Sequence, residues 1–356
     1  MPRAHSGAPA ISRHARAVRG LMIPPMHGTL VELELDAPAL AGNPLGDPGR
    51  RPLLVYLPPG HRPGLPAVYL LHGFGGSARN WLNVSTFAPT VPERIDAAIA
   101  AGALPPFVAV FPDGATRLGG TQWIDAPAVG RYQTYVAEDV VRAVEARFGT
   151  RADRAARAVL GKSSGGYGAL RMGRDRPEVF AHVACHSGDA YFEYCYLADL
   201  PKAAAALLAA PSAAAWLDEA RRRARETRLR GDDHTVLNVL AMAAHYGPDP
   251  SQPLGLALPF ELPSGRLRAD VWARWLAEDP VRFVPASLDA FRRLATVFLD
   301  CGTRDEYHLR WGARMIADAL RSGGVEVVHE EFEDGHGGIN YRLDRSLAVI
   351  VPRMAG

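Results

Sequence analysis

A-V-L-G-K-S-S-G-G-Y-G-A-L-R-M, residues 158–172, joins a short apolar run to helix-forming residues through a glycine-rich turn. Within it, Gly161, Ser163 and Gly165 form a G-x-S-x-G motif. A nucleophile elbow holds its serine in a strained strand-to-helix turn, so the residues two before and two after it must be small. Ser163 meets this condition, whereas Ser164 would have Lys162 two positions before it. The stretch therefore predicts a strand, a turn that presents Ser163, and a helix.

We consider two other interpretations of this turn. It could be a glycine-rich strand-to-helix connection in which the serine has no chemical role. A phosphate-binding loop is disfavoured, because G-x-x-x-x-G-K-[ST] does not occur here.

Apolar runs that end in Gly or Pro lie on both sides of this turn. They read A-V-Y-L-L-H-G at 67–73, F-V-A-V-F-P at 107–112, H-V-A-C-H-S-G at 182–188 and A-T-V-F-L-D-C-G at 295–302. Short continuous apolar runs are typical of buried parallel strands. Residues 135–148 instead carry an apolar stripe at helical spacing, which Gly149 can terminate. The alternation predicts an α/β fold with a mostly parallel central sheet and helices on both faces.

The pattern divides the chain into four segments. We expect a mobile N-terminal arm at 1–20, the first part of the core at 21–188, a helical cap insertion at 189–289 and the second part of the core at 290–356. The cap contains six arginines between Arg221 and Arg230, which nearby carboxylates offset. This run predicts a solvated helix face rather than a nucleic-acid patch.

Composition excludes several classes of protein. The 356 residues carry 40 Lys and Arg against 38 Asp and Glu, a net charge of +2 that offers no field for nucleic acid or anionic lipid. We find no apolar run of about 18 residues and no signal-peptide h-region, so we expect neither a membrane partner nor secretion. Three cysteines are too few for a disulfide framework, which predicts a cytoplasmic protein.

A serine hydroxyl needs a base, and that base needs an orienting acid. In this architecture both follow the serine, in the order acid and then histidine. His336 lies in the flexible loop D-G-H-G-G, whereas His329 falls inside a predicted strand and His308 at a helix start. We therefore predict His336 as the base.

For the acid there are two candidates. Asp305 follows the glycine that ends a buried strand, and we favour it. Asp189 is the rival, because it follows the earlier strand at 182–186. For either residue the alternative is a structural role, as a surface carboxylate or as a helix N-cap.

An oxyanion needs two backbone N–H donors, one after the nucleophile and one in the loop after the third strand. These donors fall on Ser164 and Phe74, and we expect His72 to shape the second loop rather than act as a base. Trp123, Asp125 and Asp189 are candidate substrate-binding residues. For Trp123 and Asp125, packing and turn roles are at least as plausible, as they are for Asp113.

A metal site is the weaker interpretation of His182, His186 and Asp189. Four residues of extended strand span about 13 Å, whereas zinc ligands lie about 2 Å from a common ion. We therefore expect no metal and no cofactor.

The sequence resembles the esterase family of α/β-hydrolases that includes enterochelin esterase-like proteins, esterase D and the mycolyltransferases. The motifs that carry this resemblance are L-L-H-G-F-G-G, G-K-S-S-G-G-Y-G-A-L, L-D-C-G-T-R-D-E and D-G-H-G-G-I-N-Y. It implies an α/β-hydrolase fold with Ser163, Asp305 and His336 as catalytic triad and with the amides of Phe74 and Ser164 as oxyanion hole. Family members more often have a bulky residue where Ser164 stands.

These residues predict a serine hydrolase that cleaves a carboxylic ester through an acyl-enzyme, on a small-molecule or polymeric substrate. One alternative is an acyltransferase that passes the acyl group to an acceptor other than water. The other is a catalytically silent binding protein on the same fold. The sequence leaves the ester itself and the oligomeric state open.

Overall fold

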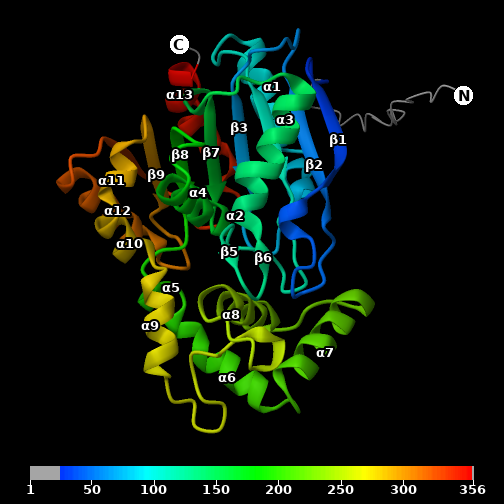
Figure 1. Ribbon diagram of the computed structural model, residues 1–356, viewed down its shortest axis with the longest axis vertical. Coiled ribbons are helices and arrows are strands. Elements are labelled where there is room, and N and C mark those ends of the chain that lie inside the picture. Colours follow the sequence, from blue (N-terminus) through cyan, green and yellow to red (C-terminus); the bar gives the residue numbers. More distant parts are fainter. Residues whose placement is uncertain (1–24, 355–356) are drawn as a thin grey trace, which may run out of the picture.

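The computed structural model describes residues 25–354, and its centre is an eight-stranded sheet (Figure 1). The strand order is β1-β2-β4-β3-β7-β8-β9-β10. β1 and β2 pair antiparallel, as do β2 and β4, and every other neighbouring pair is parallel. The strands span β1 Thr29–Asp36, β2 Arg50–Leu57, β3 Ala67–Leu71, β4 Val108–Pro112, β7 Arg157–Lys162, β8 His182–His186, β9 Thr296–Gly302 and β10 Val327–Phe332. The arm expected at 1–20 lies outside the described residues.

Both faces of the sheet are covered by helices. Alternate residues of one strand point to opposite faces and therefore pack into two different cores. In β3, Tyr69 and Leu71 join a core with α3 (Val141–Phe148) and α4 (Ser164–Asp175). Val68 and Leu70 join a second core with α1 (Val91–Ala100) and α13 (Leu343–Met354). The predicted mostly parallel sheet with helices on both faces is confirmed.

The apolar stripe predicted at 135–148 is helical but not uniformly α-helical. A short α2 (Tyr132–Thr134) leads into a π-helical turn at Tyr135–Val140, and α3 continues to Phe148. Gly149 ends the helix with φ +65°. A glycine suits this left-handed position because it carries no β-carbon.

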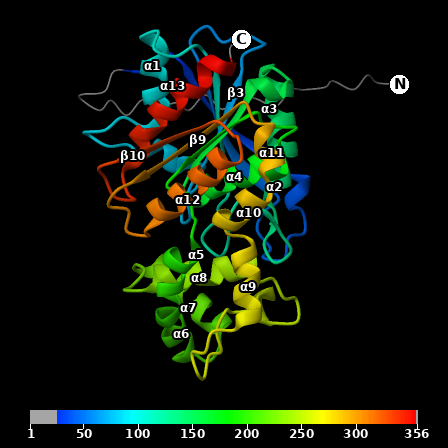
Figure 2. The same ribbon diagram turned by 90° about the vertical axis from the view of Figure 1, so that its left-hand side faces the viewer.

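Between β8 and β9 the chain is mainly helical, with two isolated β-bridges, Pro248 with Leu256 and Phe260 with Leu267. Its α-helices are α5 Phe192–Cys195, α6 Leu200–Leu208, α7 Ala213–Glu226, α8 Asp233–Tyr246, α9 Ala269–Ala277, α10 Pro280–Ala286 and α11 Leu288–Arg292, and 3-10 turns lie at Leu197–Asp199 and Pro253–Gly255. α5 to α9 form a separate layer at one end of the sheet, as both views show (Figures 1 and 2). α10 and α11 instead pack beside the sheet, where they contact α4, and α10 also contacts α12 (Leu309–Ser322).

Within residues 25–354, no single helix is both long and apolar enough to cross a membrane. One pair of helical segments, Phe192–Leu208 and Ala213–Glu226, is long and apolar enough only when the two are taken together, and the pair is bent by 93°. Cys185, Cys195 and Cys301 are buried and free of disulfides.

Candidate active site

The predicted turn at Ser163 is present at the junction of β7 and α4. Ser163 has φ +57° and ψ −126°, a conformation that L-residues rarely adopt. The glycines beside it have no room for a side chain, since a β-carbon on Gly165 would lie 2.0 Å from the Leu71 carbonyl oxygen. The helix can therefore start directly against the strand, with the Ser163 hydroxyl at the turn.

The structure brings Ser163, His336 and Asp305 together from three separate loops. His336 Nε2 lies 3.0 Å from Ser163 Oγ, and His336 Nδ1 lies 2.8 Å from Asp305 Oδ2. The Asp305 side chain is fully buried, and the His336 side chain is 16% exposed. An ionised carboxylate can only accept, which assigns the proton to Nδ1 and leaves Nε2 free to accept the Ser163 proton.

Backbone contacts fix the two loops that carry this acid and this histidine. Thr303 N donates to Phe332 O at 2.8 Å, and Arg304 N donates to Asp334 O at 3.0 Å. His336 N donates to Glu306 Oε2 at 2.7 Å. The ends of β9 and β10 are therefore tied together where their side chains must meet.

The loop after β3 leaves the Phe74 amide unused. Gly75 N donates to Gly119 O and Gly76 N donates to Gly73 O, at 3.0 and 3.1 Å. Within residues 25–354, the Phe74 N–H has no hydrogen-bond acceptor, and Ser164 N lies in the first turn of α4, where intrahelical acceptors are missing. Both residues line the cavity that contains Ser163.

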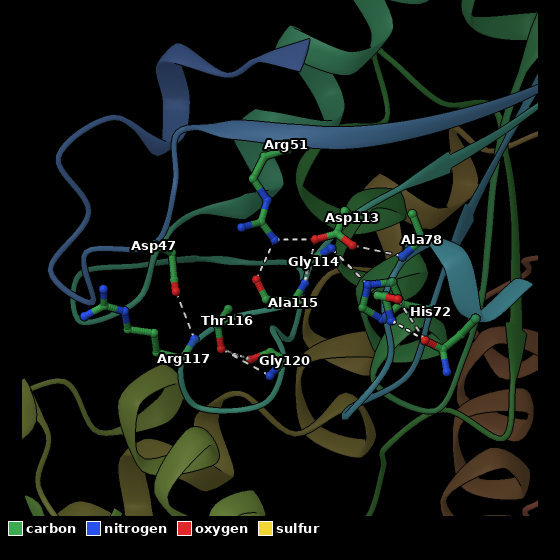
Figure 3. Close-up of polar contacts among 12 residues, drawn as sticks. Asp47, Arg51, His72, Ala78, Asp113, Gly114, Ala115, Thr116, Arg117 and Gly120 are labelled. Atoms are coloured by element: carbon green, nitrogen blue, oxygen red, sulfur yellow. Dashed lines mark hydrogen bonds and ion pairs between the residues drawn. The ribbon is translucent and has the colours of Figure 1, made fainter. Parts of the chain in front are cut away.

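His72 is buried and shapes this loop, as its position suggested. Its Nε2 accepts from Gly114 N at 2.9 Å, so Nδ1 carries the proton and donates to Gly73 O at 2.9 Å. Figure 3 shows the contacts of Asp113 beside this loop. Arg51 pairs with Asp113 at 2.5 Å, and Asp113 accepts a hydrogen bond from Ala78 N at 3.0 Å. Asp113 thus acts as a buried anchor between β2 and the loop after β3.

Asp189 contacts Ser163 and is hydrogen-bonded by three other side chains. Its Oδ2 accepts from Tyr196 OH at 2.8 Å, from Gln122 Nε2 at 3.1 Å and from Ser164 Oγ at 3.3 Å. Its Oδ1 is 3.4 Å from Ser163 Oγ. Burial raises the pKa of the Asp189 carboxyl above its usual value, against the lowering effect of these donors and of His336. No hydrogen bond joins Asp189 to His336 in the described chain.

Ser163, Asp189 and His336 share a cavity of about 430 Å³ beneath the layer of cap helices. Its wall includes the amides of Asn80, Asn238 and Asn340 and the rings of Trp81 and Tyr307. Lys162 also lines it, and burial lowers the pKa of this ammonium while Asp305 acts in the opposite direction. Sequence reasoning missed this wall, because these residues carry no motif and meet only in the folded chain.

Two other candidates lie elsewhere. Trp123 is fully buried, with φ +58°, against the glycines at 114 and 168, and its Nε1 donates to His72 O at 3.0 Å. Asp125 accepts from Thr134 N and Thr134 Oγ1, at 3.0 and 2.6 Å. Neither is among the residues that line the Ser163 cavity. Their contacts are those of packing and turn residues.

The two strand histidines have separate partners. His182 contacts Thr296 Oγ1 and Ala155 O, and His186 contacts Asp300 Oδ1 and Ser346 Oγ. In the part of the chain that the structure describes, no group of three or more His, Cys, Asp or Glu could hold a metal ion.

Comparison with known proteins identifies the family of the chain. The family described as "Putative esterase" matches residues 48–322, which is most of the chain. The chain belongs to this esterase family. The prediction of a carboxylic ester hydrolase is thereby confirmed at the level of the family.

One curated relative of this esterase is an endo-1,4-beta-xylanase/feruloyl esterase of Xylanibacter ruminicola, 28% identical over 144 residues. The match covers 38% of this chain and 19% of the relative, so the esterase spans only about a fifth of that protein's length.

Solved structures extend the likeness to nearly the whole chain. A ferulic acid esterase has a TM-score of 0.60 at 18% identity and covers 92% of this chain and 100% of its own. An S-formylglutathione hydrolase of Agrobacterium tumefaciens has a TM-score of 0.51 at 16% identity and covers 93% and 97%. At these identities the likeness establishes the fold, and the esterase has the predicted α/β-hydrolase fold.

Proposed function

We propose that this esterase cleaves carboxylic esters with Ser163 as nucleophile, His336 as general base and Asp305 as orienting acid. The observation that carries the proposal is the continuous hydrogen-bonded line from Ser163 Oγ through His336 to Asp305, at 3.0 and 2.8 Å. Nε2 takes the hydroxyl proton as Oγ attacks the acyl carbon, and the buried Asp305 carboxylate stabilises the imidazolium that forms.

The tetrahedral intermediate carries a negative oxygen that needs donors. The N–H groups of Phe74 and Ser164 border the cavity and fill this role, each contributing about 3 kcal/mol by analogy with other acyl-transfer sites. Collapse breaks the ester C–O bond, and His336 Nε2–H gives its proton to the leaving alcohol. Water, deprotonated by the same imidazole, then hydrolyses the acyl-enzyme and releases the carboxylic acid.

Polar side chains in the cavity wall favour an ester that carries polar groups on either side of the reacting carbon. Among residues 25–354, Asp189 Oδ1 has no hydrogen bond shorter than its 3.4 Å contact with Ser163 Oγ, so it is available to a donor on the substrate. The relatives are esterases of ferulic acid and a hydrolase of S-formylglutathione, which makes hydroxycinnamoyl esters and small thioesters the first substrates to compare. A cytoplasmic location remains a prediction from the cysteine count.

The test is turnover of aryl esters and thioesters of increasing acyl size by wild type and by Ser163→Ala. We expect a rapid first release of aryl alcohol equal to the enzyme concentration, and its loss in Ser163→Ala. Release without this dependence on Ser163 would overturn the proposal. Adding a second alcohol separates hydrolysis from acyl transfer, because a transferase would convert most of the acyl group to the new ester.

A further inference from the structure

A second cavity, of about 620 Å³, lies between α7 and the loop that follows β4. Its apolar lining consists of buried Ala220, half-buried Leu237 and the exposed side chains of Ala224 and Leu229. The arginines at positions 117, 221 and 225 line it as well. The sequence predicted a solvated helix face for the arginine run, and most of these arginines are exposed. Arg221 and Arg225 also border this cavity.

The arginines of α7 fall into two groups. Arg222 pairs with Glu219 and Glu226, and Arg223 pairs with Asp233 at 2.9 Å. Arg221 and Arg225, one helical turn apart, face the cavity. Positive charges at this spacing destabilise a helix unless an anion lies near them.

Few carboxylates balance the cavity-facing group. Arg225 has no carboxylate within 4.0 Å in residues 25–354, and the same holds for Arg117. Arg221 reaches only Asp218, at 4.0 Å, whose side chain is 80% exposed. Burial, with the neighbouring Arg117 and Arg225 charges, lowers the pKa of the Arg221 guanidinium.

One buried carboxylate, Asp47, lies near the arginines that line the cavity. Its Oδ1 accepts from Arg117 N at 2.9 Å, as Figure 3 shows, and its Oδ2 is buried and has no hydrogen-bond partner in the described part of the chain. Burial raises the pKa of the Asp47 carboxyl, while Arg51, Arg117 and Arg221 act in the opposite direction. Asp47 therefore offsets part of the charge, and the cavity keeps a net positive wall.

Backbone contacts hold the wall in place. Arg221 Nε donates to Arg117 O at 3.0 Å, which fixes α7 against the loop. Gly119, which lines this cavity, accepts from Gly75 N in the loop of the active-site cavity. α8 contributes to both cavities, with Leu237 on one side and Asn238 on the other.

We propose that this second cavity binds an organic carboxylate with an apolar body. Planar guanidinium groups match the two oxygens of a carboxylate, and an apolar lining beside them suits a hydrocarbon body. If the proposed function holds, the reaction releases a carboxylic acid in the cavity of Ser163, to which this cavity is linked through Gly75 and Gly119 and through α8. No residue of the proposed triad belongs to this cavity.

The test is calorimetric titration of the full chain with octanoate, acetate and 1-octanol at low salt. We expect octanoate to bind at least tenfold more tightly than acetate, which lacks the body, and than octanol, which lacks the charge. Arg225→Gln should weaken octanoate binding at least tenfold. The matched control is Arg222→Gln, on the same helix but outside the cavity, which should leave binding unchanged.

Ser163→Ala separates this site from the active site, and it should bind octanoate as the wild type does. Equal binding by wild type and Arg225→Gln, both shown to be folded by circular dichroism, would overturn the proposal. So would an equal loss in Arg225→Gln and Arg222→Gln, since that result means unspecific attraction to a basic helix. Loss of ester hydrolysis in Ser163→Ala tests the triad alone and leaves this result independent.

Discussion

Gly161 and Gly165 approach so closely at the turn around Ser163 that a β-carbon on Gly161 would lie 2.2 Å from the Gly165 carbonyl carbon. Backbone atoms cannot move aside as a flexible side-chain tip can. The strand and the helix can therefore meet at this angle only with glycine at both positions, and the position of the Ser163 hydroxyl depends on that meeting.

Gly161→Ala is thus expected to destabilise the esterase by about 1–3 kcal/mol or more through overpacking. The measurement is the free energy of unfolding from urea denaturation. Gly337→Ala is the matched control, because a β-carbon there meets nothing within 4 Å. Equal stability of both variants would show that the turn relaxes, contrary to this account.

The two carboxylates near Ser163 predict different losses of activity. Asp305 contacts His336 at 2.8 Å, whereas Asp189 contacts Ser163, Ser164 and Tyr196 instead. We expect Asp305→Asn to lower kcat by roughly 10⁴-fold, because an amide leaves the imidazole in the wrong tautomer. Asp189→Asn should act mainly on KM for substrates that carry a hydrogen-bond donor. Steady-state kinetics would contradict this assignment if Asp189→Asn caused the larger loss of kcat.

A buried ion pair beside the active-site loop should dominate local stability. The side chains of Arg51 and Asp113 are 5% and 8% exposed. Asp113→Asn leaves the Arg51 cation buried without its charge partner, and we expect a loss of about 3–5 kcal/mol. Asp289→Asn, which removes an exposed pair with Arg292, should cost less than about 1 kcal/mol. Thermal unfolding of both variants would reveal a similar small change if the Arg51 environment admits water.

His245 gives the esterase an acid-sensitive contribution to stability. Its Nδ1 donates to Ala241 O at 2.7 Å, and burial lowers its pKa from 6.5 to about 4. As pH falls below 6.5 the unfolded chain binds a proton at this histidine before the folded chain does, so stability is lost between about pH 6.5 and 4. The full effect is roughly 3 kcal/mol.

His245→Gln removes this proton uptake. We expect the stability difference between wild type and variant to shrink by that amount from pH 7 to pH 4, measured by urea denaturation at each pH. Comparison with wild type is needed because Asp279, whose pKa burial raises to about 6, has the opposite effect between about pH 4 and 6. A difference that stays constant with pH would contradict the burial of a neutral His245.

Much of this arrangement could be predicted because it depends on local sequence. The strand, turn and helix around Ser163 follow from small residues at fixed spacing, and the buried parallel strands follow from continuous apolar runs. His336 could be singled out because its loop is rich in glycine and follows the final strand. The proximity of Ser163, Asp305 and His336 then follows from the strand order, in which β7, β8, β9 and β10 are neighbours.

The rest depends on contacts between distant segments. Trp123 looked like a possible cavity residue, yet the two glycines beside it leave space for its ring inside the core. Asp125 instead binds the start of α2. Nothing local to Gln122 or Tyr196 indicates that both donate to Asp189. The arginine run could not be divided into paired and cavity-facing residues before α7 had a position.

The most direct test of the central claim is covalent labelling with a fluorophosphonate, read by intact mass and peptide mapping. We predict that the wild type gains one phosphonyl group on Ser163, with loss of fluoride and of ester hydrolysis. Ser163→Ala should gain none, and Ser164→Ala should still be labelled at Ser163. Labelling of Ser163→Ala at the wild-type rate, or a folded wild type that stays unlabelled, would contradict the assignment of Ser163 as the nucleophile.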